Sequence, residues 1–127
     1  MSSPVKPTDA ELAILQVLWQ LERATVRQVH DAMGASGVYT TTLKILQNMH
    51  AKGLVHRDES QRSHTYRAAV TEALVQNSLV KELLDKAFAG SSVQLALRAL
   101  SVKKASPEEL AELRRLLAHS SSDRGKR

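Results

Sequence analysis

The segment YTTTLKILQNMHAKGLV, residues 39–55, decides how the rest of this 127-residue chain is organised. It opens with threonines, keeps a helical spacing for about three turns and then meets a glycine, the residue type that most often ends a helix. Leu46 and Met49 form a thin apolar stripe, which either Thr42 or Leu43 extends. The remaining face is polar. Such a face on a soluble protein usually contacts only water, so the flanking sequence must indicate whether this helix instead reads DNA.

Two further helices are predicted before this segment, and each opens with a capping box. The first opens at Thr8, with a glutamate three residues later, and carries Trp19, which we expect to be a core anchor. The second opens at Thr25, with Gln28 as its reciprocal partner, and ends at Gly34. The second and third helices therefore have the proportions of a helix-turn-helix.

A β-hairpin is predicted directly after the third helix. Residues 54–57 and 64–68 are expected to form its strands, and the polar residues 58–63, DESQRS, its turn. Three helices followed by a hairpin make a winged helix-turn-helix, so the predicted fold is mainly α with a small wing.

Positive charge gathers in the same part of the chain. The net charge is +5, of which residues 39–70 contribute +3, whereas residues 8–38 contribute −2. The hairpin carries Arg57, Arg62 and Arg67 within eleven residues, a density that favours phosphate contact over a merely solvated hairpin. This distribution suits a polyanionic partner.

From Thr71 onward the pattern predicts three helices rich in leucine, the last opening at Ser106-Pro107. A unit of about fifty residues rarely buries enough apolar surface alone, so a second copy of the chain is the expected partner. We assign the dimer contacts to Leu79, Leu83, Phe88, Leu97, Leu110, Leu113 and Leu117.

The expected organisation has three parts. Residues 1–70 form the winged-helix DNA-binding domain, residues 71–118 the helical dimerisation region, and residues 119–127 a disordered basic tail.

No catalytic or metal-binding signature appears in the sequence. Cysteine is absent, and no nucleophile elbow, phosphate-binding loop or zinc-protease motif occurs. His56 and His64 are the one pair that could approach across the hairpin, and two ligands do not make a closed zinc site. We therefore expect neither an enzyme nor a cofactor or metal. Since no stretch approaches the roughly 20 apolar residues of a membrane span, we expect a cytoplasmic protein without membrane insertion.

With these elements placed, the sequence resembles the penicillinase repressor family of bacterial regulators, the BlaI, MecI and CopY type. The resemblance covers residues 8–70 well, and residues 71–118 as a helical region of the right size. The matching motifs are Thr8-Asp9-Ala10-Glu11, Val17-Leu18-Trp19, Thr25-Val26-Arg27-Gln28-Val29, Tyr39-Thr40-Thr41, Lys52-Gly53-Leu54, and Arg57, Arg62 and Tyr66 in the wing.

The resemblance implies a dimeric winged-helix repressor whose third helix reads an operator. It places Thr40 and Thr41 at the start of the reading helix, and it places Asn48 where the family often has arginine. Because arginine favours guanine and asparagine favours adenine, a different operator is implied. The cysteine-rich metal hook of copper-responsive members is excluded. The Asn-Phe cleavage pair of antibiotic-responsive members is missing, since Phe88 follows Ala87.

These observations lead to one hypothesis and one alternative. The hypothesis is a sequence-specific transcriptional repressor that binds a palindromic operator in double-stranded DNA as a homodimer. A membrane sensor peptidase, which a neighbouring gene would reveal, is a further candidate partner. The alternative is a winged-helix protein-interaction module without DNA binding. The expected base contacts are Thr40, Thr41, Gln47 and Asn48, and the expected phosphate contacts are Lys44, Arg57, Arg62 and Arg67.

Overall fold

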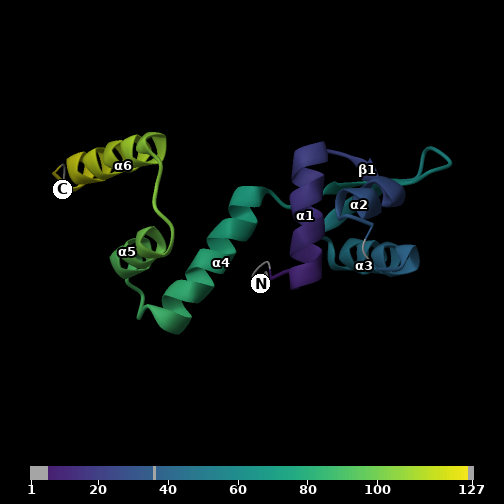
Figure 1. Ribbon diagram of the computed structural model, residues 1–127, viewed down its shortest axis with the longest axis horizontal. Coiled ribbons are helices and arrows are strands. Elements are labelled where there is room, and N and C mark those ends of the chain that lie inside the picture. Colours follow the sequence, from purple (N-terminus) through teal and green to yellow (C-terminus); the bar gives the residue numbers. More distant parts are fainter. Residues whose placement is uncertain (1–5, 36, 126–127) are drawn as a thin grey trace. The chain divides into compact units, whose positions relative to one another are not determined.

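A computed structural model of the chain describes residues 6–35 and 37–125. The described part is mainly helical with a small antiparallel sheet, so the predicted winged helix-turn-helix followed by a helical region is confirmed (Figure 1). The chain divides into two compact units, Met1–Glu82 and Leu83–Arg127.

The first unit opens with the three predicted helices, α1 (Asp9–Leu21), α2 (Val26–Ala32) and α3 (Tyr39–Lys52). Both predicted capping boxes are present. The Glu11 amide donates to the Thr8 hydroxyl over 3.2 Å, and the Gln28 amide donates to the Thr25 hydroxyl over the same distance. The helix α3 has no side-chain cap at its start and ends at Gly53, whose φ of 82° is left-handed.

The sheet has three strands, in the order β1 (Ala24–Thr25), β3 (Thr65–Ala68), β2 (Val55–Asp58). The two longer strands are the predicted hairpin. The two-residue strand β1 was expected only as a connection between helices. Its pairing of Ala24 with Tyr66 joins residues far apart in the chain, which no local pattern reveals.

The core of this unit draws on every element of the predicted winged helix and continues into α4 (Glu72–Ala87). Trp19 is partly buried against this core, and its indole N–H donates to the Val70 carbonyl over 2.9 Å. Trp19 therefore holds the end of the wing beside α1. The largest fully buried side chains are Ile14, Leu15, Leu18, Val29, Leu46, Met49, Val55, Tyr66 and Val75.

The helix α4 contributes to both units, because the division between the two compact units falls between Glu82 and Leu83. Val75 is fully buried in the core of the first unit, and Leu79 packs against the same core. Leu79 is thus partly buried within a single copy of the chain. Its assignment to the dimer stays a prediction.

The second unit contains the end of α4, then α5 (Ser92–Val102) and α6 (Pro107–Gly125). The disordered tail was expected to begin at His119, but α6 continues through this segment to Gly125, and residues 126–127 lie outside the described part. No glycine or proline interrupts the helix between Pro107 and Gly125. A polar composition alone therefore did not mark where the helix ends.

Candidate nucleic-acid interface

The helix α3 buries one narrow face and exposes the rest. Thr42, Leu46 and Met49 are buried, so Thr42 extends the apolar stripe while Leu43 is half-buried. The exposed positions include every residue of α3 that the sequence assigns to DNA. These are Thr40, Thr41, Lys44, Gln47 and Asn48.

A groove of about 390 Å³ lies where α3 meets the hairpin and the start of α2. Three of the predicted DNA contacts line it: Gln47, Arg57 and Arg62. Its other lining residues include Arg27 and Tyr39. The lining holds three arginines and no acidic side chain, so the groove is suited to an anion.

Arg57 is braced within the protein. Its Nε donates to Glu59 Oε2 over 2.7 Å, and its side chain is only 26% exposed. Hydrogen bonding to the Tyr66 side chain, together with the Glu59 carboxylate, holds the pKa of Arg57 above its usual value. The positive charge of Arg57 is therefore partly neutralised by Glu59 before any ligand binds.

Arg67 lies on the other face of the hairpin. It pairs across the strands with His56, whereas Arg57 pairs with Tyr66, and successive residues of a strand point to opposite faces. It lines a second surface hollow, which shares Arg57 and Tyr66 with the groove and also includes Arg23. Arg23 Nη1 lies 3.9 Å from Asp58 Oδ2. Arg67 is therefore near Arg57 and Tyr66 in this second hollow but does not line the groove itself.

The two histidines of the hairpin are also separated. His56 lines the hollow on the outer face, whereas His64 lines the groove beside α3. Among the described residues, no group of three or more histidine, cysteine, aspartate or glutamate side chains is placed to hold a metal ion.

Arg27 is the groove residue that the sequence did not identify. Its guanidinium carbon lies 4.8 Å from the centroid of the Tyr39 ring. Tyr39 in turn meets the ring of His30 edge-on, with centroids 5.7 Å apart and planes at 75°. The motif Thr25–Val29 had marked Arg27 only as part of a resemblance. Its contact with α3 depends on how two helices pack, which sequence spacing does not report.

Lys52 anchors α3 to α1 at the end far from the threonines. Its ammonium donates to Glu11 Oε2 over 2.7 Å, and the Glu11 side chain is 5% exposed. Burial raises the pKa of Glu11, but the hydrogen bond from Lys52 and those of the Thr8 cap outweigh it, so the pKa lies below its usual value. Lys52 therefore fixes the helix that carries the exposed polar face.

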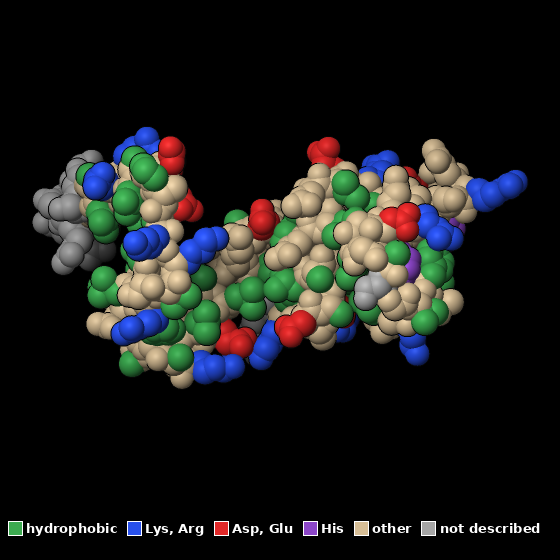
Figure 2. All heavy atoms as spheres, viewed as in Figure 1, with side chains coloured by type: hydrophobic (Ala, Val, Ile, Leu, Met, Phe, Trp, Pro, Cys, Tyr) green, Lys and Arg blue, Asp and Glu red, His purple; other side chains and the backbone are tan. Residues whose placement is uncertain are grey.

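The second unit exposes most of the residues assigned to dimerisation. Among its described side chains, residues 83–120, none is buried. Leu97 is 56% exposed and Leu117 is 66% exposed, while Phe88 and Leu113 are half-buried. In Figure 2, hydrophobic side chains lie on the surface of the C-terminal helices among lysines and arginines.

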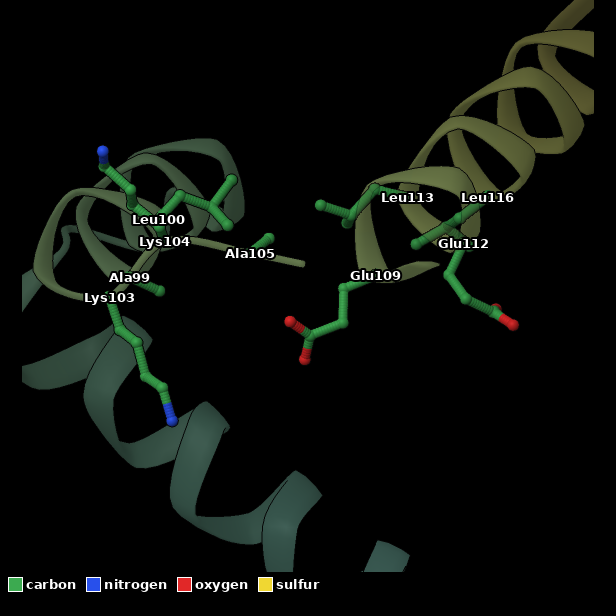
Figure 3. A pocket seen from close by; sticks show the side chains of 9 residues that line it. All are labelled: Ala99, Leu100, Lys103, Lys104, Ala105, Glu109, Glu112, Leu113 and Leu116. Carbon is green, nitrogen blue, oxygen red and sulfur yellow. The ribbon is translucent and has the colours of Figure 1, made fainter. Parts of the chain in front are cut away.

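A cavity of about 600 Å³ lies between α5 and α6 within this unit. Figure 3 shows Leu100 of α5 and Leu113 of α6 pointing toward one another across it, with Glu109 near its edge. Its walls are largely apolar, as expected for helices that have not closed a core between them.

No helix in the described part of the chain is both long and apolar enough to cross a membrane.

Comparison with known proteins found a matching family model, related sequences and similar solved structures. A family model described as penicillinase repressor matches residues 7–119. The transcriptional regulator BlaI of Mycobacterium tuberculosis is 34% identical over 122 residues, covering 94% of this chain and 88% of that protein. The methicillin resistance regulatory protein MecI of Staphylococcus aureus is 20% identical over 112 residues, covering 87% of this chain and 91% of MecI. Among solved structures, a variant of ZitR from Lactococcus lactis has a TM-score of 0.48 at 16% identity, covering 97% of this chain and 79% of that one.

Proposed function

This chain belongs to the penicillinase repressor family, and we propose that it is a sequence-specific DNA-binding repressor that acts as a homodimer on a palindromic operator. BlaI and MecI are transcriptional regulators, and the chain is a regulator of this kind rather than an enzyme. Membership of the family supports the role in transcriptional regulation. The exposed face of α3 with its neighbouring groove supports DNA as the ligand, and the exposed leucines of the second unit support a dimer.

The observation that carries the proposal is the exposed polar face of α3 beside a groove lined by arginines. An α-helix fits the major groove of B-DNA, where each base pair presents a distinct set of donors and acceptors. Thr40, Gln47 and Asn48 can form hydrogen bonds with base edges from that position. The groove between α3 and the hairpin would then meet the adjacent phosphates with a positive surface.

The proposed contacts fall into two groups. Thr40, Thr41, Gln47 and Asn48 face bases, and Lys44 and Arg62 face phosphates. Arg57, Arg67 and Lys52 are engaged with other residues or lie away from the groove. We therefore give Arg57 and Arg67 a smaller part in binding than the hairpin sequence suggested.

The dimer is proposed for the second unit. Its described helices leave leucines exposed and bury no side chain, and a matching surface on a second copy would cover them. Two copies related by a twofold axis would place two reading helices in successive major grooves. The operator half-sites would then lie about one helical turn, or a multiple of it, apart.

Selection of bound duplexes from a random pool tests the proposal, with the protein's stoichiometry measured on the selected sequence. We expect a palindrome that binds two copies. An asymmetric site that binds one copy would contradict the dimer. If no sequence is enriched and binding does not weaken with salt, the alternative of an interaction module without DNA would replace the proposal.

A further inference from the structure

We propose that Arg27, on the second helix, contacts the DNA backbone, and that Tyr39 is the positioning residue that holds its guanidinium beside the groove. The inference rests on the DNA-binding function proposed above. It adds to the interface a cation from outside the reading helix and the wing.

The guanidinium of Arg27 is placed by an aromatic ring. Its central carbon lies 4.8 Å from the Tyr39 ring centroid, well inside the range of a cation–π contact. Both residues line the groove with Gln47 and Arg62. A phosphate in this groove would therefore meet Arg27 on the side opposite the hairpin.

The Tyr39 ring is itself held in place. The ring of His30 meets it edge-on at 5.7 Å, and His30 is only 6% exposed. His30 Nδ1 lies 2.9 Å from the hydroxyl of the buried Thr42, which joins α2 to α3 beneath the ring. Tyr39 thus stands between a buried histidine and an exposed arginine side chain, and its ring limits where that arginine can point.

Arg27 also has hydrogen-bonding capacity to offer. Stacking on a ring leaves the guanidinium N–H donors in its plane available, and the planar fork matches the oxygens of a phosphate. Arg27 is exposed, and no ion pair joins it to any acidic side chain in the described part of the chain. Arg57, by contrast, already has Glu59 at 2.7 Å. Of these two arginines, Arg27 is the better placed to take up a new anion.

The test measures binding to a duplex of mixed sequence, about three helical turns long, at several NaCl concentrations. A phosphate contact does not depend on sequence, so the operator need not be known. We expect Arg27→Ala to weaken binding and to reduce the salt slope by about one per subunit. Arg27→Lys should keep most of the slope, because it keeps the charge, and should lose part of the affinity.

Two further variants separate positioning from charge. Tyr39→Phe keeps the ring and should bind like the wild type. Tyr39→Leu removes the ring face and should lose affinity while Arg27 keeps its charge. If Tyr39→Leu binds like the wild type while Arg27→Ala does not, the positioning role is wrong.

Arg23→Ala is the matched control, since it removes one positive charge from the same unit at a residue that faces Asp58 on the outer side of the hairpin. Circular dichroism and thermal melts would establish that each variant folds. A wild type that shows no salt-dependent binding would contradict the proposed function itself. A wild type that binds, with equal slopes for the wild type, Arg23→Ala and Arg27→Ala, would overturn only the role of Arg27.

Discussion

The side chains of α3 differ in what they contact within the folded unit. Thr42 bonds to His30 and Lys52 to Glu11, so these polar residues are engaged inside the protein. Thr40, Gln47 and Asn48 are exposed. The polar residues of α3 thus have two roles: some hold the helix in the fold, and others are available to contact a ligand. Variants of the first group should lose stability, and variants of the second group should lose binding.

Replacing Asn48 by Ala should change sequence preference more than general affinity. Asparagine can bond in a bidentate manner to adenine, and one such pair contributes about 1–3 kcal/mol of discrimination. Selection from a random pool with the variant would show relaxed preference at one position of each half-site. Lys44→Ala is the matched comparison on the same helix, expected to weaken binding to all sequences alike. An unchanged consensus for Asn48→Ala would make this residue plain helix surface.

Replacing Lys52 by Met should destabilise the fold by about 1 kcal/mol at neutral pH, a modest figure because the Lys52 side chain is half exposed. The Glu11 pKa is lowered in the folded state from its usual 4.5. Its pairing therefore stabilises the fold above that pH, and the stabilisation is lost as the pH falls through the lower folded value. Urea unfolding at pH 7 and near pH 3 should show the difference between wild type and variant shrinking at acidic pH.

Glu11→Gln offers the control for that experiment. Glutamine can keep the capping box while the charge is removed, because its side-chain oxygen can accept from the cap amide as Gln28 does from Thr25 at the start of α2. Lys52→Met in the Glu11→Gln background should cost less than Lys52→Met alone. A cost that is equal in both backgrounds, or that does not change with pH, would show that the ion pair with Glu11 does not account for the effect of Lys52.

Among the elements, the hairpin places three arginines in three different surroundings. Arg57 lies on the face toward α3 and is bonded to Glu59, Arg62 lies in the turn, and Arg67 lies on the outer face. The sequence presents three equivalent arginines. The pleat of the strands gives each one a different neighbour.

Replacing Arg62 by Ala should therefore weaken binding to all sequences and flatten the salt slope by about one per subunit. Arg67→Ala, which removes the same charge from the other face, should flatten the salt slope less. Binding isotherms at several salt concentrations would measure the slope for both variants. Equal losses for the two variants would mean that the hairpin meets DNA with both faces, and an unchanged slope for Arg62→Ala would remove the wing from the interface.

At the scale of the whole molecule, the two units differ in whether they close their own core. The first unit buries side chains from α1 through α4, whereas the described side chains of the second unit include none that is buried. Helices without a core of their own gain little from folding alone, because ordering each residue costs about 1–2 kcal/mol in backbone entropy. Association would supply the missing burial.

Replacing Leu97 by Asp should therefore weaken self-association at least about tenfold, since it would place an unpaired charge in the proposed dimer surface. Sedimentation equilibrium would measure it. Leu79→Ala is the contrasting variant, because Leu79 packs on the core of the first unit. It should lower thermal stability and leave association unchanged. A wild type that stays monomeric at all concentrations would contradict the proposed dimer.

The sequence by itself determined the elements whose signals are local. A capping box spans four residues, so Thr8 and Thr25 marked two helix starts before any packing was known. Gly53 marked the end of α3 because a left-handed residue is needed there. Alternation of polar and apolar residues placed the hairpin, and helical periodicity placed Thr40, Lys44, Gln47 and Asn48 on an exposed face.

Only the tertiary structure decided what those faces meet. The strand β1, the bond from Lys52 to Glu11 and the stacking of Arg27 on Tyr39 each join different elements of the chain. The same holds for the packing of Leu79 against the core of the first unit, which the leucine pattern does not reveal. The physical reason is that periodicity fixes the direction of a side chain on its own element. Its partner depends on how the elements pack, and that is a property of the whole fold.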